Sequence, residues 1–383
     1  MASMRIVGIE RDKTACNFYR VLSPLSQLDS KGMAEVIMLQ ENELGSDKAV
    51  NACMWADLLV FQRPATEAWF KFIKLCRRNG KLIVSDYDDD PFNTSPLNPY
   101  YQYIGIEEYA IQWPDGTKEM LWSEGMVSPD GSKIFNIERN INHRDMFHLN
   151  FKKSDMVTCT TETLRESFLK INPNVTVLPN LIDFSFFPQV PQINKREVRI
   201  GWQGGCSHYE DLYMIKNVLA RILDKHSNAK LVFFGDMRFK SLFNKCNPSQ
   251  VEWHPWVSHS AYPYKLALLN LDIGLCPLVD NVFNRNKSAI KWMEYSAMKY
   301  ATVASDIPPY KGVLEHDRTA LLVPESEDAW FDAIDELVRD KYKRVRLAQN
   351  AYDCVHSLHN MENHTHLWHD AYDKLMKGNL VTA

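Results

Sequence analysis

Two lysines, a serine and a glutamate are grouped in the sequence Asn-Lys-Ser-Ala-Ile-Lys-Trp-Met-Glu, which spans residues 286–294. The spacing predicts a helix capped by the asparagine at position 284 or 286. In such a helix Lys287, Lys291 and Glu294 stand at i, i+4 and i+7 and share one face. These residue types on one face are suited to binding a phosphorylated nucleoside.

The predicted helix start has the composition of an anion site. Free backbone N–H groups and partial positive charge would attract a diphosphate, and Arg285, Asn286, Lys287 and Ser288 would add side-chain donors. Lys291 would neutralise the charge on a departing diphosphate. Glu294, roughly 9 Å further along the helix, would accept hydrogen bonds from ribose hydroxyls. The alternative is a solvated face whose lysines and glutamate form only weak ion pairs.

A glycine pair provides a second candidate phosphate contact. Gly204 and Gly205 follow an apolar strand pattern and precede a helical one, with His208 at the start of that helix. Glycine would let the backbone approach a pyrophosphate closely. A plain tight turn is the alternative interpretation.

Carboxylates are concentrated in the run Asp86-Tyr87-Asp88-Asp89-Asp90, directly after an apolar strand pattern. We expect them at the carboxyl edge of a parallel sheet, where Asp86 and Asp88 would act in catalysis by orienting an acceptor or donor sugar. Asp89 and Arg20 would lie on the acceptor side. The alternatives are helix capping and a D-x-D site for Mg²⁺ or Mn²⁺.

Two series of alternating strands and helices must position these residues. Apolar runs predict strands at 5–9, 35–39, 58–61, 81–85, 156–160 and 175–178, and again at 198–202, 230–234, 273–276, 302–305 and 320–323. Such alternation predicts an α/β protein with two Rossmann-like, doubly wound parallel sheets facing a cleft. The proline-containing linker near residue 190 separates the two series.

These patterns give three expected parts. Residues 1–188 form an acceptor-side domain, residues 196–355 form a nucleotide-sugar-binding domain, and residues 356–383 form a helix that returns to the first domain. An insert at about 91–150, rich in Tyr, Trp and Asn, interrupts the first domain. Its length favours a role in acceptor recognition or self-association, and an ordinary helical elaboration is the alternative.

Composition narrows the class of protein. A net charge of -4 argues against broad attraction to nucleic acid, and eight widely spaced cysteines without a CxxC pair indicate reduced thiols. No apolar run is long enough to cross a membrane, so we expect a cytoplasmic protein. Five histidines near the C-terminus fit no zinc spacing, and we expect no metal or other cofactor.

The second half resembles retaining GT-B glycosyltransferases of family 4 and related bacterial and phage members. Their signature Glu-Ala-x-Ala-x-Gly-x-Pro-Val-Val-Ala-Ser corresponds here to residues 294–305, Glu-Tyr-Ser-Ala-Met-Lys-Tyr-Ala-Thr-Val-Ala-Ser. Further landmarks follow in the expected order at residues 177–183, 200–205 and 234–236. One departure is that Asn286 stands where the family's E-x7-E pattern has its first glutamate.

The resemblance implies a retaining, metal-independent hexosyl- or pentosyltransferase that uses a nucleotide-sugar, with UDP as the expected nucleotide. It implies that the segment with Trp256 and Val257 runs alongside the nucleobase. It also implies that a phosphate oxygen of the donor accepts the proton of the acceptor hydroxyl. The acceptor would be a glycan, a protein or a hydroxymethylated DNA base of phage type, in a bacterial or infected-host cytosol. The rival interpretations are a non-catalytic nucleotide- or sugar-binding GT-B module and a Mg²⁺-dependent transferase centred on Asp86 and Asp88.

Overall fold

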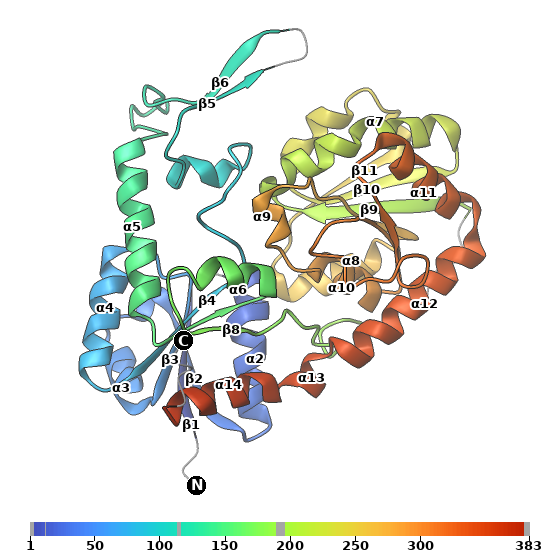
Figure 1. The fold of residues 1–383 in the computed structure, drawn as a ribbon. Helices are drawn as coiled ribbons and strands as arrows, with labels where there is room; N and C mark the ends of the chain where they lie inside the picture. Colours follow the sequence, from blue (N-terminus) through green and yellow to red (C-terminus); the bar gives the residue numbers. More distant parts are fainter. Residues whose placement is uncertain (1–3, 12, 113–115, 189–195, 379–383) are drawn as a thin grey trace. The chain divides into compact units, whose positions relative to one another are not determined.

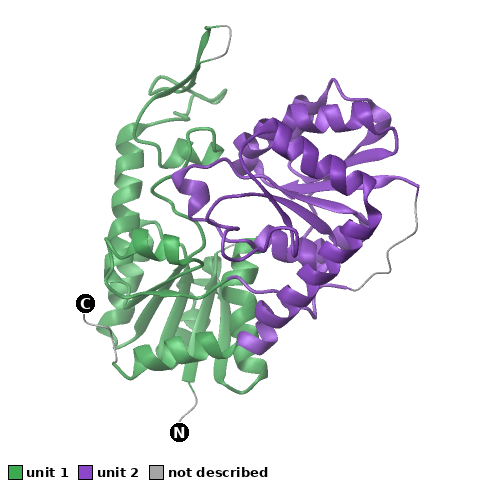
Figure 2. Cartoon of the chain, turned by 45° about the vertical axis from the view of Figure 1, so that its right-hand side comes forward, with its two compact units in different colours: residues 1–179, 365–383 green, residues 180–364 purple. Residues whose placement is uncertain are grey.

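The structure is a computed structural model that describes residues 4–11, 13–112, 116–188 and 196–378 (Figure 1). The chain divides into two compact units, coloured in Figure 2. Unit 1 comprises Met1–Pro179 and Thr365–Ala383, and unit 2 comprises Asn180–His364. The linker predicted near residue 190 lies partly outside the described residues. The chain passes into unit 2 ten residues before it and returns to unit 1 at Thr365.

Unit 1 is built on a six-stranded parallel sheet with the order β2-β1-β3-β4-β7-β8. The strands are β1 (Met4–Glu10), β2 (Ala34–Gln40), β3 (Leu58–Gln62), β4 (Leu82–Tyr87), β7 (Met156–Cys159) and β8 (Val175–Val177). The inner strands are buried on both faces, which explains why they read as continuous apolar runs. Every predicted strand of this sheet is present.

Helices cover this sheet, and several begin at a Ser, Thr or Asn whose side chain accepts a backbone N–H. They are α1 (Ala15–Asn17), the π-helical η1 (Phe18–Leu22), α2 (Ser23–Ser30), η2 (Glu41–Glu43), α3 (Asp47–Trp55), α4 (Glu67–Arg78), α5 (Ile137–Lys153), α6 (Glu162–Phe168) and α14 (His366–Met376). The last of these, α14, contacts α2 within unit 1.

The insert is part helix and part hairpin. It contains η3 (Pro99–Tyr103), the antiparallel pair β5 (Tyr109–Gln112) and β6 (Lys118–Trp122), and the long helix α5. Figure 1 shows the hairpin beyond the amino end of α5, away from the sheet of unit 1. Trp122 donates its indole N–H to the Pro96 carbonyl at 2.6 Å, and the ring of Tyr101 lies parallel to that of Phe135. These aromatic residues give the insert a small core of its own.

Unit 2 holds a second six-stranded parallel sheet with the order β11-β10-β9-β12-β13-β14. Its strands are β9 (Val198–Gly204), β10 (Ala229–Gly235), β11 (Val251–Pro255), β12 (Ile273–Cys276), β13 (Ala301–Ser305) and β14 (Leu321–Val323). The order is that of a dinucleotide-binding sheet, in which the chain changes direction across the sheet after the third strand. Strand β11 is an edge strand that the sequence analysis did not predict.

The helices of unit 2 bury their apolar faces on this sheet, with residues such as Leu219, Ile334 and Leu347 in the core. They are η4 (Cys206–His208), α7 (Tyr209–Lys225), η5 (Met237–Phe243), η6 (Pro248–Gln250), η7 (His259–Ala261), α8 (Tyr262–Leu268), α9 (Val282–Arg285), α10 (Ile290–Ala297), α11 (Glu327–Arg339), α12 (Lys341–Leu358) and α13 (Met361–His364). In the described part of the chain, no helix is long and apolar enough to span a membrane.

Candidate nucleotide site

The candidate site of unit 2 begins where β9 ends. Strand β9 lies between β10 and β12, so the loops that leave β9 and β12 run to opposite sides of the sheet. Ligands of doubly wound sheets bind at such a switch point. A Cβ on Gly204 would lie 2.6 Å from the buried ring of Trp202, whereas one on Gly205 would meet nothing within 4 Å. Gly204 therefore must be glycine for packing, and Gly205 lies beside open space.

Lys291 is a buried cation near this switch point. It lies in the first turn of α10, with its ammonium 5.0 Å from the centre of the Trp202 ring. The side chain is 8% exposed, and its Nζ has no hydrogen-bond partner among the described residues. Burial lowers the pKa of Lys291, and nearby Lys287 lowers it further, while the charges of Asp211 and Glu294 oppose the shift. A buried ammonium without hydrogen bonds is costly, and an anionic ligand would relieve that cost.

A histidine and an aspartate form a hydrogen-bonded pair beside Lys291. His208 Nδ1 lies 2.7 Å from Asp211 Oδ2, and Asp211 Oδ1 accepts from the Val279 N–H at 2.8 Å and from Asn284 Nδ2 at 2.9 Å. Burial lowers the pKa of His208 to about 4, and the charge of Lys291 acts in the same direction. The imidazole is therefore neutral near pH 7, with Nδ1–H donating to Asp211 and Nε2 able to accept.

Asp211 links the loops that follow two neighbouring strands. Burial alone would raise its pKa, but the hydrogen bond with His208, the Val279 N–H and the charge of Lys291 outweigh burial and the pKa is lowered. Asp211 thus remains ionised while it fixes His208 on one side and the segment after β12 on the other. Asp211 was not predicted from the sequence, since an aspartate in the first turn of a helix is common for electrostatic reasons alone.

Glu294 lies one helical turn after Lys291, so the two side chains share a face of α10. The carboxylate is 4% exposed, and its Oε2 accepts from Gln203 Nε2 at 2.5 Å and from the Tyr262 hydroxyl at 2.8 Å. The Tyr262 ring is stacked on Phe234, 5.5 Å between centres. Gln203 and Tyr262 therefore orient Glu294. Both escaped the sequence analysis, because they are 91 and 32 residues distant from Glu294.

The predicted helix start near residue 286 is wrong. Asn281 caps the short helix α9 with its side chain, and Asn286 ends that helix, 2% exposed. Helix α10 begins only at Ile290, after Ala289, so Lys287 and Ser288 lie in a connecting loop. A single face that carries Lys287, Lys291 and Glu294 is therefore not formed. The four residues from Asn286 to Ala289 break the helical path that the spacing suggested.

The loop residues have contacts of their own. Ser288 Oγ accepts from Asn180 Nδ2 at 2.8 Å, and the Lys287 ammonium lies 4.4 Å from the centre of the Phe283 ring. Arg285 is held by Asp280 at the surface, at 2.5 Å. Several of the predicted donor contacts therefore lie near the switch point: Lys291, Glu294, His208 and the glycine pair. Arg285 instead forms an ion pair with Asp280.

Trp256 and Val257 follow the edge strand β11 and are 49% and 36% exposed. The Trp256 ring lies 5.5 Å from that of Phe234, and Gly235 has a φ of +133°. A Cβ on Gly235 would lie 2.3 Å from the Gly204 carbonyl and 2.9 Å from the Trp256 ring. Glycine at position 235 therefore permits the close approach of Trp256 to the end of β9.

In unit 1, the first predicted catalytic aspartate is part of a buried ion pair. Asp86 lies inside β4 and is 1% exposed. Its Oδ1 accepts from Arg20 Nε at 2.9 Å, and its Oδ2 accepts from Arg20 Nη2 at 2.7 Å and from Thr158 Oγ1 at 2.6 Å. Arg20 also donates to the Leu178 carbonyl. A substrate could reach Asp86 only if this pair opened, so we interpret Asp86 and Arg20 as a lock between η1, β4 and β7.

Asp88 and Asp89 lie at the carboxyl edge of the same sheet and are half-buried. Arg63, which follows β3, forms an ion pair with Asp88, and Asp89 Oδ2 lies 3.7 Å from its Nη2. Burial would raise the pKa of Asp88, but the charge of Arg63 outweighs it and the pKa is lowered. Arginines thus compensate both carboxylates of the D-x-D pattern. Among the residues that the structure describes, no cluster of three or more His, Cys, Asp or Glu side chains could hold a metal ion.

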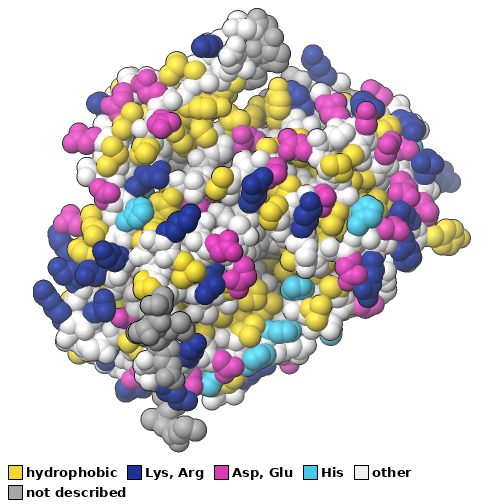
Figure 3. Space-filling view, viewed as in Figure 1, with side chains coloured by type: hydrophobic (Ala, Val, Ile, Leu, Met, Phe, Trp, Pro, Cys, Tyr) yellow, Lys and Arg dark blue, Asp and Glu magenta, His cyan; other side chains and the backbone are white. Residues whose placement is uncertain are grey.

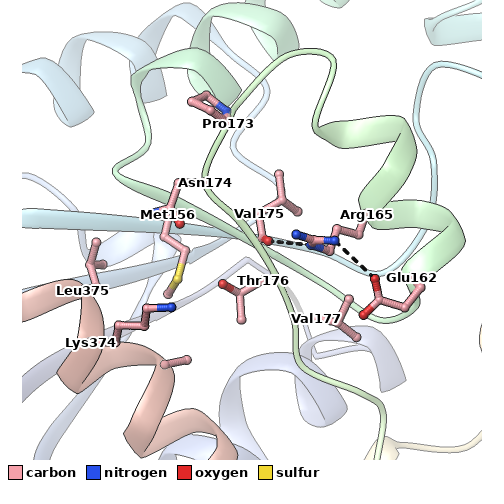
Figure 4. Close-up of a pocket in the computed structure, with 11 residues that line it drawn as sticks. Met156, Glu162, Arg165, Pro173, Asn174, Val175, Thr176, Val177, Lys374 and Leu375 are labelled. Carbon is pink, nitrogen blue, oxygen red and sulfur yellow. Dashed lines mark hydrogen bonds and ion pairs between the residues drawn. The ribbon is translucent and has the colours of Figure 1, made fainter. Parts of the chain in front are cut away.

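A separate cavity of about 300 Å³ lies in unit 1 between β8 and α14 (Figure 4). Arg165 lines it, and its guanidinium donates to the Val175 carbonyl at 3.0 Å and pairs with Glu162. These contacts tie α6 to the edge strand. The cavity therefore contains a structural bridge and none of the predicted site residues.

The segment that contains the candidate site is similar to a known protein family. Residues 197–340 match the family model for group 1 glycosyl transferases, a segment that contains the glycine pair, His208, Lys291 and Glu294. No curated protein matches the chain.

Solved structures match over nearly the whole chain. Anabaena HepE in complex with UDP and glucose has a TM-score of 0.65 at 12% identity, covering 97% of this chain and 100% of that one. Sucrose-phosphate synthase from Thermosynechococcus elongatus has a TM-score of 0.66 at 12% identity, covering 98% and 100%. A glycosyltransferase from Rickettsia africae has a TM-score of 0.60 at 11% identity, covering both chains fully. The chain has the GT-B fold, as the sequence analysis predicted.

Proposed function

We propose that this chain is a glycosyltransferase that moves a sugar from a UDP-sugar to an acceptor hydroxyl with retention of configuration and without a metal. The observation that carries the proposal is the environment of Lys291. It is a buried ammonium without a hydrogen-bond partner among the described residues, one helical turn from an oriented glutamate, in the segment that matches group 1 glycosyl transferases. A nucleoside diphosphate has the anionic group and the vicinal hydroxyls that these two side chains would bind.

In the proposed reaction, the bond between the anomeric carbon and the diphosphate oxygen breaks, and its electron pair goes to that oxygen. Lys291 stabilises the negative charge that develops there. The acceptor oxygen forms the new bond to the anomeric carbon, and its proton passes to the departing phosphate. Neutral His208, held by Asp211, accepts a hydrogen bond from a sugar hydroxyl through Nε2. Glu294 accepts hydrogen bonds from the ribose.

On the acceptor side we propose Asp88 and Asp89, which lie at the carboxyl edge of the sheet of unit 1, and we omit Asp86 because of its lock with Arg20. The proposed acceptor is a hydroxyl of a glycan, with a hydroxymethylated DNA base as the other acceptor to assay. On the face in Figure 3, basic and acidic side chains are interspersed. A polyanion track would instead show one sign of charge, which is why we place the glycan first.

Calorimetry with two ligands tests the proposal. UDP contains the diphosphate and the ribose, whereas uridine contains the ribose alone. Lys291→Met should weaken UDP binding about 10- to 100-fold, as expected for loss of a charge-assisted hydrogen bond, and should leave uridine binding unchanged. Glu294→Gln should weaken the binding of both UDP and uridine. Lys216→Gln is the matched control, because Lys216 also lies over an aromatic ring of unit 2, that of Tyr213.

Equal UDP affinity in wild type and Lys291→Met would refute the assignment. Release of UDP from UDP-glucose by the purified protein would distinguish an enzyme from a binding module. Turnover that persists in excess EDTA would dispose of the Mg²⁺-dependent alternative, in which Asp86 and Asp88 hold the ion.

A further inference from the structure

A second cavity, of about 360 Å³, lies at the amino edge of the sheet in unit 2, where the strands begin. Val198 at the start of β9, Asp272 just before β12 and the junction between α11 and α12 contribute to its wall. Donor recognition in the proposed function uses the carboxyl edge of this sheet. The cavity at the amino edge is therefore a different site, and anion binding there is independent of the proposed function.

The wall of this cavity is strongly basic. Five lining residues are cationic and two are acidic: Arg196, Lys299, Arg339, Lys341 and Arg344 against Glu197 and Asp272. Both acidic residues accept hydrogen bonds from Arg199. Its Nη1 donates to Glu197 at 2.8 Å, and its backbone N–H donates to Asp272 at 2.8 Å.

Most of the cations lack such compensation. Arg339 is held by Asp335 at 2.9 Å. The other four cationic residues of the wall form no ion pair within the described ranges of the chain. The cavity wall thus has an excess of positive charge that ion pairs within the described part of the protein compensate only in part.

Arg344 is the most informative of these cations. It is 9% exposed, and its Nη1 donates to the carbonyls of Leu337 and Val338. Two neutral carbonyls fix the guanidinium in place without neutralising it, and burial lowers the pKa of Arg344. Asp272 and Asp340 attract the guanidinium electrostatically without forming an ion pair with it, and a bound anion would compensate the buried charge further. The planar guanidinium fork is suited to phosphate oxygens.

Lys299 provides an independent observation. It lies two residues after the end of α10 at Ala297 and has a φ of +58°, a left-handed conformation that favours glycine. In the resembling signature this position is glycine, whereas here it is a lysine whose side chain lines the cavity and lies 4.4 Å from the Tyr352 ring. The chain therefore has a cation in the cavity at a position where glycine would relieve backbone strain.

We propose that this cavity, with Lys299, Lys341 and Arg344 as its cationic groups, binds a small anion that bears a phosphate dianion. Inorganic phosphate is the simplest probe of the site. Succinate has the same charge without a tetrahedral phosphate and should bind at least tenfold more weakly.

Calorimetric titration of the full chain with phosphate, with and without UDP, tests the proposal. Wild type should bind phosphate saturably, with the same affinity whether or not UDP is present. Lys299→Gly and Lys341→Gln should each lower the affinity for phosphate about tenfold. The glycine variant should melt at or above the wild-type temperature, so its loss of affinity cannot come from misfolding. Lys216→Gln, which removes a lysine of unit 2 outside the cavity, should bind phosphate like wild type.

Several outcomes would overturn the proposal. One is the absence of saturable phosphate binding, and another is full affinity in Lys299→Gly. If Lys216→Gln lost as much phosphate affinity as the cavity variants, phosphate binding would depend on the overall charge of the protein and not on this cavity. Loss of phosphate binding in the presence of UDP would place the phosphate at the donor site, and equal affinity for succinate would remove the phosphate specificity.

Discussion

Replacing Lys291 by methionine should stabilise the free protein and weaken its ligand binding at the same time. The ammonium is 8% exposed and has no hydrogen-bond partner among the described residues. An unsatisfied buried polar group costs about 1–3 kcal/mol, and methionine is an apolar side chain of similar length. We expect Lys291→Met to gain about 1–2 kcal/mol in the free energy of unfolding, or roughly 2–8 °C in Tm for a unit of this size.

The stability difference between Lys291→Met and wild type should shrink or reverse when UDP is added. At a UDP concentration of about 100 times its Kd, wild type gains about 2.7 kcal/mol. A variant that binds about 30-fold more weakly gains only about 0.9 kcal/mol from the same concentration. UDP should therefore stabilise wild type by about 1.8 kcal/mol more than the variant, which removes most or all of the advantage of Lys291→Met.

Differential scanning calorimetry of wild type and variant, with and without UDP, measures both effects. Lys216→Met is the control and should change the free energy of unfolding by less than about 0.5 kcal/mol, because Lys216 is partly exposed. A Lys291→Met protein that is less stable than wild type without ligand would refute the reasoning, since it would mean that the ammonium is already satisfied. An unchanged response to UDP would refute the diphosphate contact.

Three further predictions follow from contacts in the two units. The pKa of His208 falls from 6.5 to about 4 on folding, so the unfolded chain binds more protons between these pH values. The free energy of unfolding should therefore rise by roughly 3 kcal/mol as the pH rises from 4 to 6.5. Urea titrations should show a weaker dependence of this free energy on pH for His208→Gln, and an equal dependence would contradict the shift. Arg20→Met should lower the free energy of unfolding by about 3–5 kcal/mol, because it leaves Asp86 buried and uncompensated. Adding Asp86→Leu should recover part of that stability, and chemical denaturation can measure both changes. Gly204→Ala should destabilise unit 2 by about 1–3 kcal/mol through its clash with Trp202, seen as a lower Tm, and a neutral effect would show that the ring can move.

Most of the fold could be predicted from the sequence because its strands are buried on both faces. Such strands read as apolar runs, and the predicted range 273–276 coincides with β12. Strand β11 was missed because it lies at an edge, is only half-buried and contains Glu252 and His254. The hairpin β5–β6 was missed because its exposed strands lack the alternating pattern of a strand with one buried face.

The candidate site was predictable only in part. Lys291 and Glu294 are close in sequence, so helical spacing could place them on one face. The helix start was placed wrongly because an asparagine in a suitable position is compatible with several caps, and the chain uses Asn281 for the preceding helix. Gln203 and Asp211 could not be found by local patterns, since their partners lie on segments brought together by the sheet.

Cations that form no ion pair among the described residues lie near both edges of the unit 2 sheet, and the two cases differ physically. Lys291 is a point charge beside Trp202, close to an oriented carboxylate, which favours a ligand that offers both an anion and hydroxyl groups. Arg344 is a planar fork fixed by two carbonyls among other cations, which favours an anion alone. Each of these cations has carboxylates nearby but no ion pair among the described residues, so part of its desolvation cost is not recovered in the free protein. An unbound protein gains nothing from this arrangement, and binding of anions at each edge is the simplest physical account of it.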